Sequence, residues 1–142
     1  MNEKNLMLVD VCNVKIQGRI RGSLRNSLDF LAEKATSFSG FFKTELVVDS
    51  YQGRGACVER EVLNKERNIE RIFVPGTADN YILDTVSNNK KSGEYREITI
   101  DTDDKGLRTK TLLLVGIHPV FNIEFLGVAD FLNNHHSKSG LV

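Results

Sequence analysis

The sequence predicts an α/β fold, a three-layer α/β/α sandwich around a central, mainly parallel sheet of five strands. The 142 residues suffice for one domain with a full core. Short apolar runs alternate with segments of helical character, which favours parallel strands joined by right-handed crossovers. The first two runs are nearly continuous in Leu, Met and Val, as in strands covered by helices on both faces. We expect one domain over residues 1–134 and a polar tail over 135–142.

Five short apolar runs are predicted to be the strands. They are residues 6–11 (LMLVDV), 45–50 (ELVVDS), 69–75 (IERIFVP), 97–102 (EITIDT) and 118–121 (HPVF). The connection from 51 to 65 is the least patterned part of the chain. It stays open between a short helix and an irregular excursion.

Four segments have the pattern of helices. Residues 23–38 place Leu and Ala at i, i+4, i+7 and i+11, which gives one apolar stripe. Thr77 is expected to cap a second helix, which ends at the polar stretch NNKKSGE. Residues 107–115 are expected to form a third helix that stops at Gly116. Asn122 is expected to cap a fourth, IEFLGVADFLNN.

Aspartates follow the ends of the predicted strands. Because the carboxyl ends of parallel strands meet at one edge of a sheet, we expect all of these side chains on one rim. They are Asp10, Asp49, Asp79, Asp101, Asp103 and Asp104. Like charges in a partly desolvated cleft raise one another's pKa, so such a cluster favours a bound cation. A set of oxygen ligands on an open rim suits Mg²⁺.

Single aspartates at these places also have structural explanations. Asp79, at the start of a helix, fits a helix cap, and Asp49 fits a turn. Asp10 is different because it ends a buried strand, where a carboxylate carries a desolvation cost that indicates a ligand or a partner. Taken jointly, the acids favour a metal site.

Positive residues are expected to flank this rim. The 19 basic and 19 acidic residues cancel, so affinity for nucleic acid has to come from local clustering. The segment 15–25, KIQGRIRGSLR, holds four cations and no acid. The candidates for phosphate contacts are Lys15, Arg19, Arg21, Arg54, Lys105 and Arg108. A metal site beside such cations is typical of nucleases, in which an activated water attacks a phosphodiester.

Several other functions lack the residues they need. No apolar run is long enough to cross a bilayer, so we expect a cytoplasmic protein without a membrane partner. Cys12 and Cys57 form no CxxC pair, and neither GxxxxGK nor GxGxxG occurs. The histidines, His118, His135 and His136, come late in the chain and have no zinc-ligand spacing.

Four motifs resemble the NYN domain of the PIN-like nuclease superfamily, in its YacP-like branch. LMLVDVCNVKIQG is similar to the opening motif, with Asp10 and Asn13 at its acidic and amide positions. IFVPGTADNYILDTV is similar to the T-A-D signature, with Asp79 on its Asp. DTDDKGLR is similar to the T-x-D-x-x-L segment, with Asp104 in register, and GIHPVFNIEFL is similar to the closing strand and helix.

The resemblance implies strand order 3-2-1-4-5 and a nuclease that acts on RNA with Mg²⁺ or Mn²⁺. By position, Asp10, Asp79 and Asp104 would bind the metal, and Asn13 would orient a ligand water or phosphate. Asp84, five residues after Asp79, corresponds to a further acid of the family. The sequence does not decide whether Asp104 or its neighbour Asp103 points into the site, nor whether one or two metals bind.

We therefore predict a metal-dependent endoribonuclease whose acidic site lies at the carboxyl-end rim of the sheet. The chain has Val11 where the family usually has Gly, and Asn80 where many relatives carry a second acid. These departures favour the alternative, an NYN-like module that binds RNA or a protein partner with little or no turnover. The sequence leaves open which RNA is cut, whether a ribosome or another protein takes part, whether the role is that of a toxin or a decay factor, and the oligomeric state.

Overall fold

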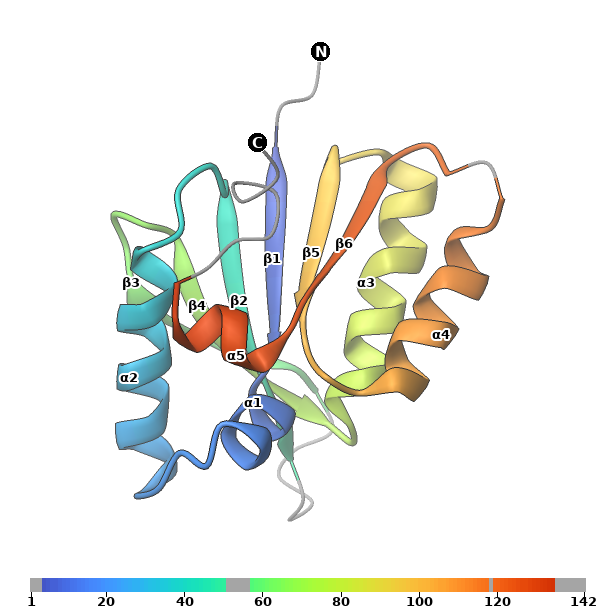
Figure 1. Ribbon diagram of the computed structural model, residues 1–142. Coiled ribbons are helices and arrows are strands. Elements are labelled where there is room, and N and C mark those ends of the chain that lie inside the picture. The colour runs from blue at the N-terminus through green and yellow to red at the C-terminus, as the bar shows by residue number, and fades with distance from the viewer. Residues whose placement is uncertain (1–3, 51–56, 118, 135–142) are drawn as a thin grey trace.

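The computed structural model describes residues 4–50, 57–117 and 119–134. Helices cover both faces of one sheet, with α1, α2 and α5 on one face and α3 and α4 on the other (Figure 1). In chain order the elements are β1 (Asn5–Asp10), α1 (Val11–Gln17), α2 (Leu24–Thr36), β2 (Lys43–Ser50), β3 (Glu59–Asn64), β4 (Ile69–Pro75), α3 (Ala78–Ser92), β5 (Glu97–Asp101), α4 (Lys105–Val115), β6 (Asn122–Leu126) and α5 (Val128–Leu132). The α/β class predicted from the sequence is confirmed.

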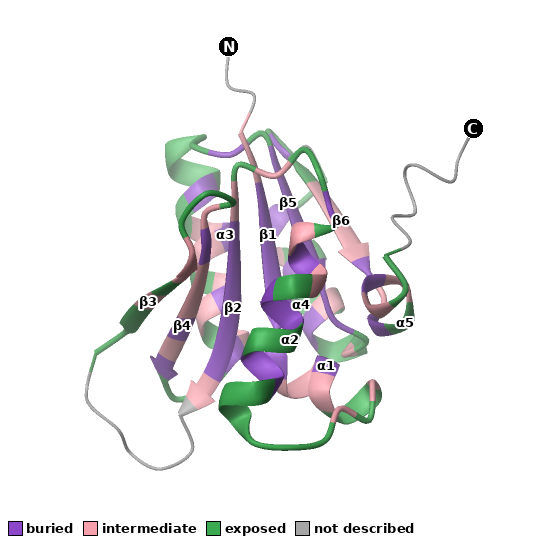
Figure 2. Ribbon diagram, turned by 90° about the vertical axis from the view of Figure 1, so that its left-hand side faces the viewer, coloured by how far each residue is buried: buried purple, intermediate pink, exposed green. Residues whose placement is uncertain are grey.

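The strand β1 is buried on both faces, which explains its continuous apolar sequence. Met7 and Val9 pack in the core under α1, α2 and α5, whereas Leu6 and Leu8 pack in the core under α3 and α4. This alternation follows from the two-residue period of a strand. Figure 2 shows β1 buried over most of its length, from Leu6 to Asp10. Charged groups at its carboxyl end therefore emerge next to a desolvated interior.

The sheet has six strands in the order β3-β4-β2-β1-β5-β6. Each pair of neighbours in the series β4, β2, β1, β5 and β6 is parallel, whereas the edge strand β3 pairs with β4 antiparallel. The predicted five-stranded sheet with order 3-2-1-4-5 is therefore wrong, because it contained no strand in the 51–65 connection. The missed strand has the sequence EREVLN, and such charge is common on edge strands, where it discourages pairing with another chain.

Three predicted helices are confirmed as α2, α3 and α4, although α4 begins at Lys105 rather than Leu107 and α3 runs through most of the polar NNKKSGE stretch. The hydroxyl of Ser23 accepts a hydrogen bond from the Asn26 amide at the start of α2, and that of Thr77 accepts one from the Asn80 amide at the start of α3. The helix α4 ends at Gly116, whose φ of 86° is unfavourable for other residues. The capping residues Ser23 and Thr77 were enough to predict where their helices begin, because each cap bonds to a residue only three positions away.

Two predictions at the ends of strands are wrong. Asn122 does not cap a helix; it begins β6, whose residues pair with β5 over its whole length. The strand predicted at residues 118–121 therefore lies further along the chain, as β6. Residues 122–126 have a helical pattern, but their pairing with β5 overrides it. The chain also turns into helix α1 directly at Val11, where a continued strand was expected, and Val11 and Val14 anchor this helix in the core.

Within the described ranges, no helix is both long and apolar enough to cross a membrane. Four residues named from the sequence, and the tail at 135–142, lie outside the described part of the chain. The residues are Arg54, His118, His135 and His136.

Candidate functional site

Four aspartates from four separate segments lie at the carboxyl-end rim of the sheet. Asp10 is the last residue of β1, and Asp49 lies one residue before the end of β2. Asp79 lies in the first turn of α3, just after β4, and Asp104 is the N-cap of α4, just after β5. Because β4, β2, β1 and β5 are parallel neighbours, these positions share one rim. We call these four residues the aspartate cluster.

Electrostatic coupling shows that the members of the cluster lie within one another's field. Burial, with smaller contributions from the charges of Asp79 and Asp49, raises the pKa of Asp10 to about 6, although hydrogen bonds from Thr102 and Asn13 partly oppose this rise. Burial also raises the pKa of Asp79, and Asp104 and Asp49 add to this rise while Lys110 opposes it. The aspartates therefore repel one another at neutral pH, as expected of a site that favours a cation.

Thr102 connects the carboxylate of Asp10 to the backbone of Asp104. Its buried hydroxyl donates to Oδ2 of Asp10 at 3.0 Å and accepts from the backbone N–H of Asp104 at 3.1 Å. The guanidinium of Arg108 holds the carbonyl of Thr102 through Nε at 3.1 Å and Nη2 at 2.6 Å. The sequence marked Thr102 only as a residue in a motif, because its partner Asp10 is 92 residues away.

Two members of the cluster also cap helices. Oδ1 of Asp49 accepts from the Ala78 amide at 2.6 Å, and Oδ1 of Asp104 accepts from the Leu107 amide at 3.1 Å. Each of these bonds uses one carboxylate oxygen and fixes the side chain at the rim. Asp49 and Asp104 therefore each have a structural role, and Asp49 caps α3 instead of forming the turn expected from the sequence.

Asp79 is not a helix cap. The caps of α3 are Thr77, which accepts from the Asn80 amide, and Asp49, which accepts from the Ala78 amide. Within the described residues, the carboxylate of Asp79 has no hydrogen bond or ion pair, although it is partly buried among other acids. A capping hydrogen bond therefore does not explain this aspartate, although its place in the first turn of α3, where the helix dipole favours an anion, is a structural reason that remains.

The side chains of Asp103 and Asn13 make their hydrogen bonds outside the aspartate cluster. Oδ1 of Asp103 accepts from the Val128 amide at 3.0 Å, at the start of α5. Oδ1 of Asn13 accepts from the backbone N–H of Asp103 at 2.8 Å, so this amide positions the loop after β5. Of the neighbouring pair, Asp104 is the one that couples to Asp79.

Asp101 belongs to the opposite face of the sheet. It pairs with Val9, whose side chain lies in the core under α1, α2 and α5. Its carboxylate is completely buried, neither oxygen has a hydrogen-bond partner within the described residues, and this burial raises its pKa well above the ordinary value. The expectation that all six aspartates share one rim is wrong for Asp101, because side chains alternate along β5.

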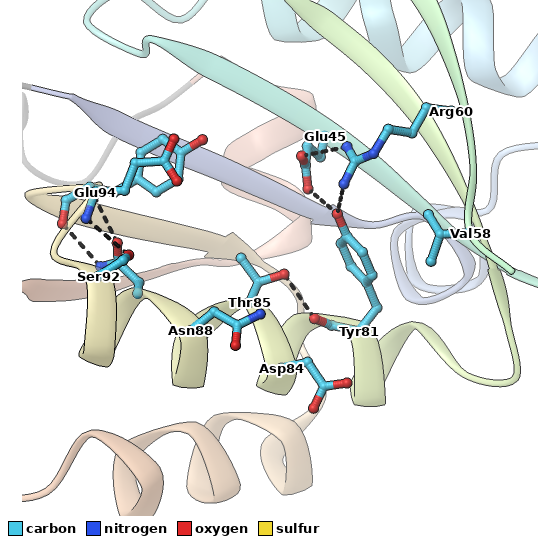
Figure 3. Close-up of a pocket in the computed structure, with 11 residues that line it drawn as sticks. Glu45, Val58, Arg60, Tyr81, Asp84, Thr85, Asn88, Ser92 and Glu94 are labelled. Carbon is cyan, nitrogen blue, oxygen red and sulfur yellow. Dashed lines mark hydrogen bonds and ion pairs between the residues drawn. The ribbon is translucent and has the colours of Figure 1, made fainter.

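Asp84 lies in a separate hollow along α3. This hollow has a volume of about 380 Å³ and lies between α3 and the strands β2 and β3. Figure 3 shows Asp84 below Tyr81, whose hydroxyl donates to Glu45 at 2.7 Å and accepts from Arg60 at 3.0 Å. A spacing of five residues turns Asp84 away from Asp79, since five residues exceed one turn of a helix.

The six predicted phosphate-binding cations do not form one belt. Nζ of Lys15 donates to the carbonyl of Gly22 and to the hydroxyl of Ser27, both at 3.0 Å, and so fastens the α1–α2 connection. Arg108 is occupied by Thr102, as described above. The cations exposed to solvent are Arg19, Arg21 and Lys105, and Arg54 lies outside the described residues.

The donor set of the cluster suits a hard divalent cation, because it consists of carboxylate oxygens. In the described part of the chain, no group of three or more His, Cys, Asp or Glu side chains is arranged so that it could hold a metal ion. Mg²⁺ usually binds one or two carboxylates and keeps several waters, so it does not require such a group. Comparisons of the chain with protein-family models, curated proteins and solved structures found no match.

The raised pKa of Asp10 predicts how stability depends on pH. The folded state binds a proton on Asp10 up to about pH 6, whereas the unfolded chain releases it near 3.8. The contribution of Asp10 to the free energy of unfolding should therefore fall as pH rises from about 4 to about 6. Urea unfolding of the wild-type protein and of Asp10→Asn in EDTA, at pH 4, 5, 6 and 7, measures this contribution as a difference. The free energy of unfolding of Asp10→Asn minus that of the wild type should increase from about pH 4 to about pH 6 and then level off. A difference that does not change with pH would contradict the prediction.

Proposed function

We propose that this protein is a metal-dependent endoribonuclease of the NYN type, with its reactive centre at the aspartate cluster. The observation that carries the proposal is the partly buried carboxylate of Asp79, which caps no helix and is repelled by its acidic neighbours. Asp10 supports it, because a carboxylate that is only 4% exposed is costly at neutral pH unless a cation compensates it. Both residues match acidic positions of the family motif.

Asp10 and Asp79 are the primary candidates for binding Mg²⁺ or Mn²⁺, and the second oxygens of Asp49 and Asp104 are available for bound waters. When bound, the metal would supply an activated water and stabilise the departing oxygen of a phosphodiester. Thr102 holds Asp10 in a fixed orientation and links it to the backbone of Asp104. Arg108 keeps Thr102 in place, so its contribution is to position the carboxylates rather than to bind phosphate.

Metal dependence is tested with purified protein and an RNA oligonucleotide labelled at one end. Cleavage is expected with Mg²⁺ or Mn²⁺, and no cleavage is expected in EDTA. Asp79→Asn should reduce the rate by about a hundredfold or more, because it removes a charged ligand of the reactive centre. The products are resolved by denaturing electrophoresis.

The matched control is Asp84→Asn, the same change five residues further along α3. Asp84 faces the hollow beside Tyr81, so this variant should retain the wild-type rate. Equal rates for wild type and Asp79→Asn, or cleavage that persists in EDTA, would contradict the proposal.

The second candidate is an RNA-binding or partner-binding module with little turnover. It is favoured by the use of Asp49 and Asp104 as helix caps, and by the lack of a three-ligand group within the described residues. RNA binding that does not depend on metal, with no cleavage under any metal condition, would support this candidate.

A further inference from the structure

We propose that a pocket between the α1–α2 connection, α2 and α5 binds one nucleotide of single-stranded RNA. The pocket has a volume of about 450 Å³, and we call it the basic pocket. Its phosphate ligands are Arg19, Arg21 and Lys34, and its base platform is Phe30. The choice of RNA as the ligand rests on the proposed function, but the geometry of the pocket does not.

The charge of the basic pocket selects an anion. Its lining contains three cations and no acid, although the protein as a whole is neutral. Asn26, in the first turn of α2, also lines the pocket, and that turn contains no acidic residue. The positive end of a 13-residue helix therefore adds to the field of the side chains.

The basic pocket also offers an aromatic surface. Phe30 is 41% exposed, although Leu28 and Leu31 on the same helix are buried. Nζ of Lys34 lies 5.6 Å from the centre of the Phe30 ring. An exposed ring beside cations is the combination that binds single-stranded nucleic acid, since the base stacks while the cations hold the backbone. An inorganic anion has no base that could stack on the Phe30 ring.

The fold holds the wall of this pocket in a defined shape. Lys15 fastens the α1–α2 connection to α2 through Gly22 and Ser27. A Cβ atom at Gly18 would lie 2.5 Å from Cδ1 of Leu132 and 2.7 Å from the backbone oxygen of Val14, so glycine lets the connection pack closely against both α5 and α1. Arg19 has a φ of 54°, a conformation that glycine and asparagine adopt more readily. An arginine at this position is thus explained by its side chain and not by its backbone.

The basic pocket lies within reach of the aspartate cluster. Asp10 immediately precedes α1, and Gly18 immediately follows it, so seven residues of helix separate them. At 1.5 Å per residue this helix is about 10 Å long. The helices α1, α2 and α5 lie on the same side of the sheet, as Figure 1 shows. One RNA strand can therefore extend from the cluster to the pocket, which places the pocket a short distance along the strand from the bond that is cut.

The test measures binding without cleavage. A fluorescent eight-nucleotide oligouridylate is titrated with the full chain in EDTA, and Kd is obtained from anisotropy at several salt concentrations. The double variant Arg19→Asn/Arg21→Ser should weaken binding about tenfold and reduce the salt slope by about 1.4, because two phosphate contacts are lost. Asparagine at position 19 preserves the left-handed backbone. The matched control, Lys65→Ser, removes one charge from the turn between β3 and β4 and should leave Kd unchanged.

A second variant tests the aromatic surface. Phe30→Ala should weaken binding of the oligouridylate about tenfold and leave binding of an abasic strand of equal length unchanged. Wild-type affinity in both pocket variants would overturn the inference. The inference would also be overturned if the pocket variants bound RNA as the wild type does but no longer bound phosphatidylserine vesicles or polyglutamate. The ligand of the pocket would then be a lipid surface or an acidic protein.

These measurements are independent of catalysis. If the pocket variants lose RNA binding and the wild-type protein cuts no RNA, the pocket stands and the nuclease proposal fails. If the protein cuts RNA while the pocket variants bind and cut as the wild type does, the nuclease proposal stands and the pocket fails.

Discussion

Asp10→Asn is expected to reduce metal-dependent RNA cleavage by at least about a hundredfold while making the metal-free protein more stable at pH 7. The loss of activity follows from removing a charge that the proposed metal requires. The gain in stability follows from the pKa of about 6, compared with the ordinary 3.8, which corresponds to about 3 kcal/mol of destabilisation above pH 6. Asparagine avoids this penalty, but it replaces one acceptor oxygen with an NH₂ group, so 3 kcal/mol is an upper bound.

Opposite effects on activity and stability distinguish a functional carboxylate from a structural one. Cleavage rates at saturating Mg²⁺ and urea unfolding in EDTA measure the two quantities on the same preparations. The control is Asp103→Asn, in which the side chain faces the Val128 amide and can still accept its hydrogen bond. This variant should retain the wild-type cleavage rate. An Asp10→Asn protein that is strongly destabilised, or that still cuts RNA at the wild-type rate, would show that Asp10 has only a structural role.

Phe131→Ala is expected to lower the free energy of unfolding by about 3–5 kcal/mol, which is a large part of the 5–15 kcal/mol typical of small domains. Phe131 is completely buried, and its ring stacks on Phe38 with centroids 5.6 Å apart and planes 2° apart. The change would leave a cavity between α5 and the end of α2. It would also loosen Leu132, which forms part of the basic pocket.

Phe30→Ala provides the matched control, because Phe30 is the same residue type in an exposed place. Its replacement should change the free energy of unfolding by less than about 1 kcal/mol. Urea titrations followed by far-UV circular dichroism compare the two variants. If Phe131→Ala lowers the free energy of unfolding by as little as Phe30→Ala does, α5 contributes less to the core than its packing against Phe38 indicates.

Much of the fold could be read from local patterns. Continuous apolar sequence identified β1 and β2 as strands buried on both faces, and Ser23 and Thr77 identified the starts of α2 and α3. The failures have different causes, and in one of them tertiary pairing overrode a local pattern. The segment after Asn122 has helical spacing, yet its backbone completes the hydrogen bonds of β5. The charged strand β3 has little apolar signal because it lies at an edge, with one side open to water.

The position of the candidate site could also be predicted in part from the sequence. Parallel topology places every strand end at one rim, so the chain positions of Asp10, Asp49, Asp79 and Asp104 were enough to predict that they gather there. The sequence could not show that Asp84 faces another hollow, because this depends on the rotation of α3 against the sheet. Nor could it show that Lys15 and Arg108 serve internal hydrogen bonds.

By itself, the sequence determined where strands end in acids and which segments are buried, because these properties depend on residue type and short-range period. Only the tertiary structure decided the direction of each side chain beyond a strand end. Asp103 and Asp104 are adjacent and chemically identical, yet one faces the start of α5 and the other couples to Asp79. Their directions are set by Asn13 and Thr102, and the hydrogen bonds that these residues make join segments 90 and 92 residues apart. No local pattern contains such contacts, since they exist only when the sheet has brought the ends of β1 and β5 together.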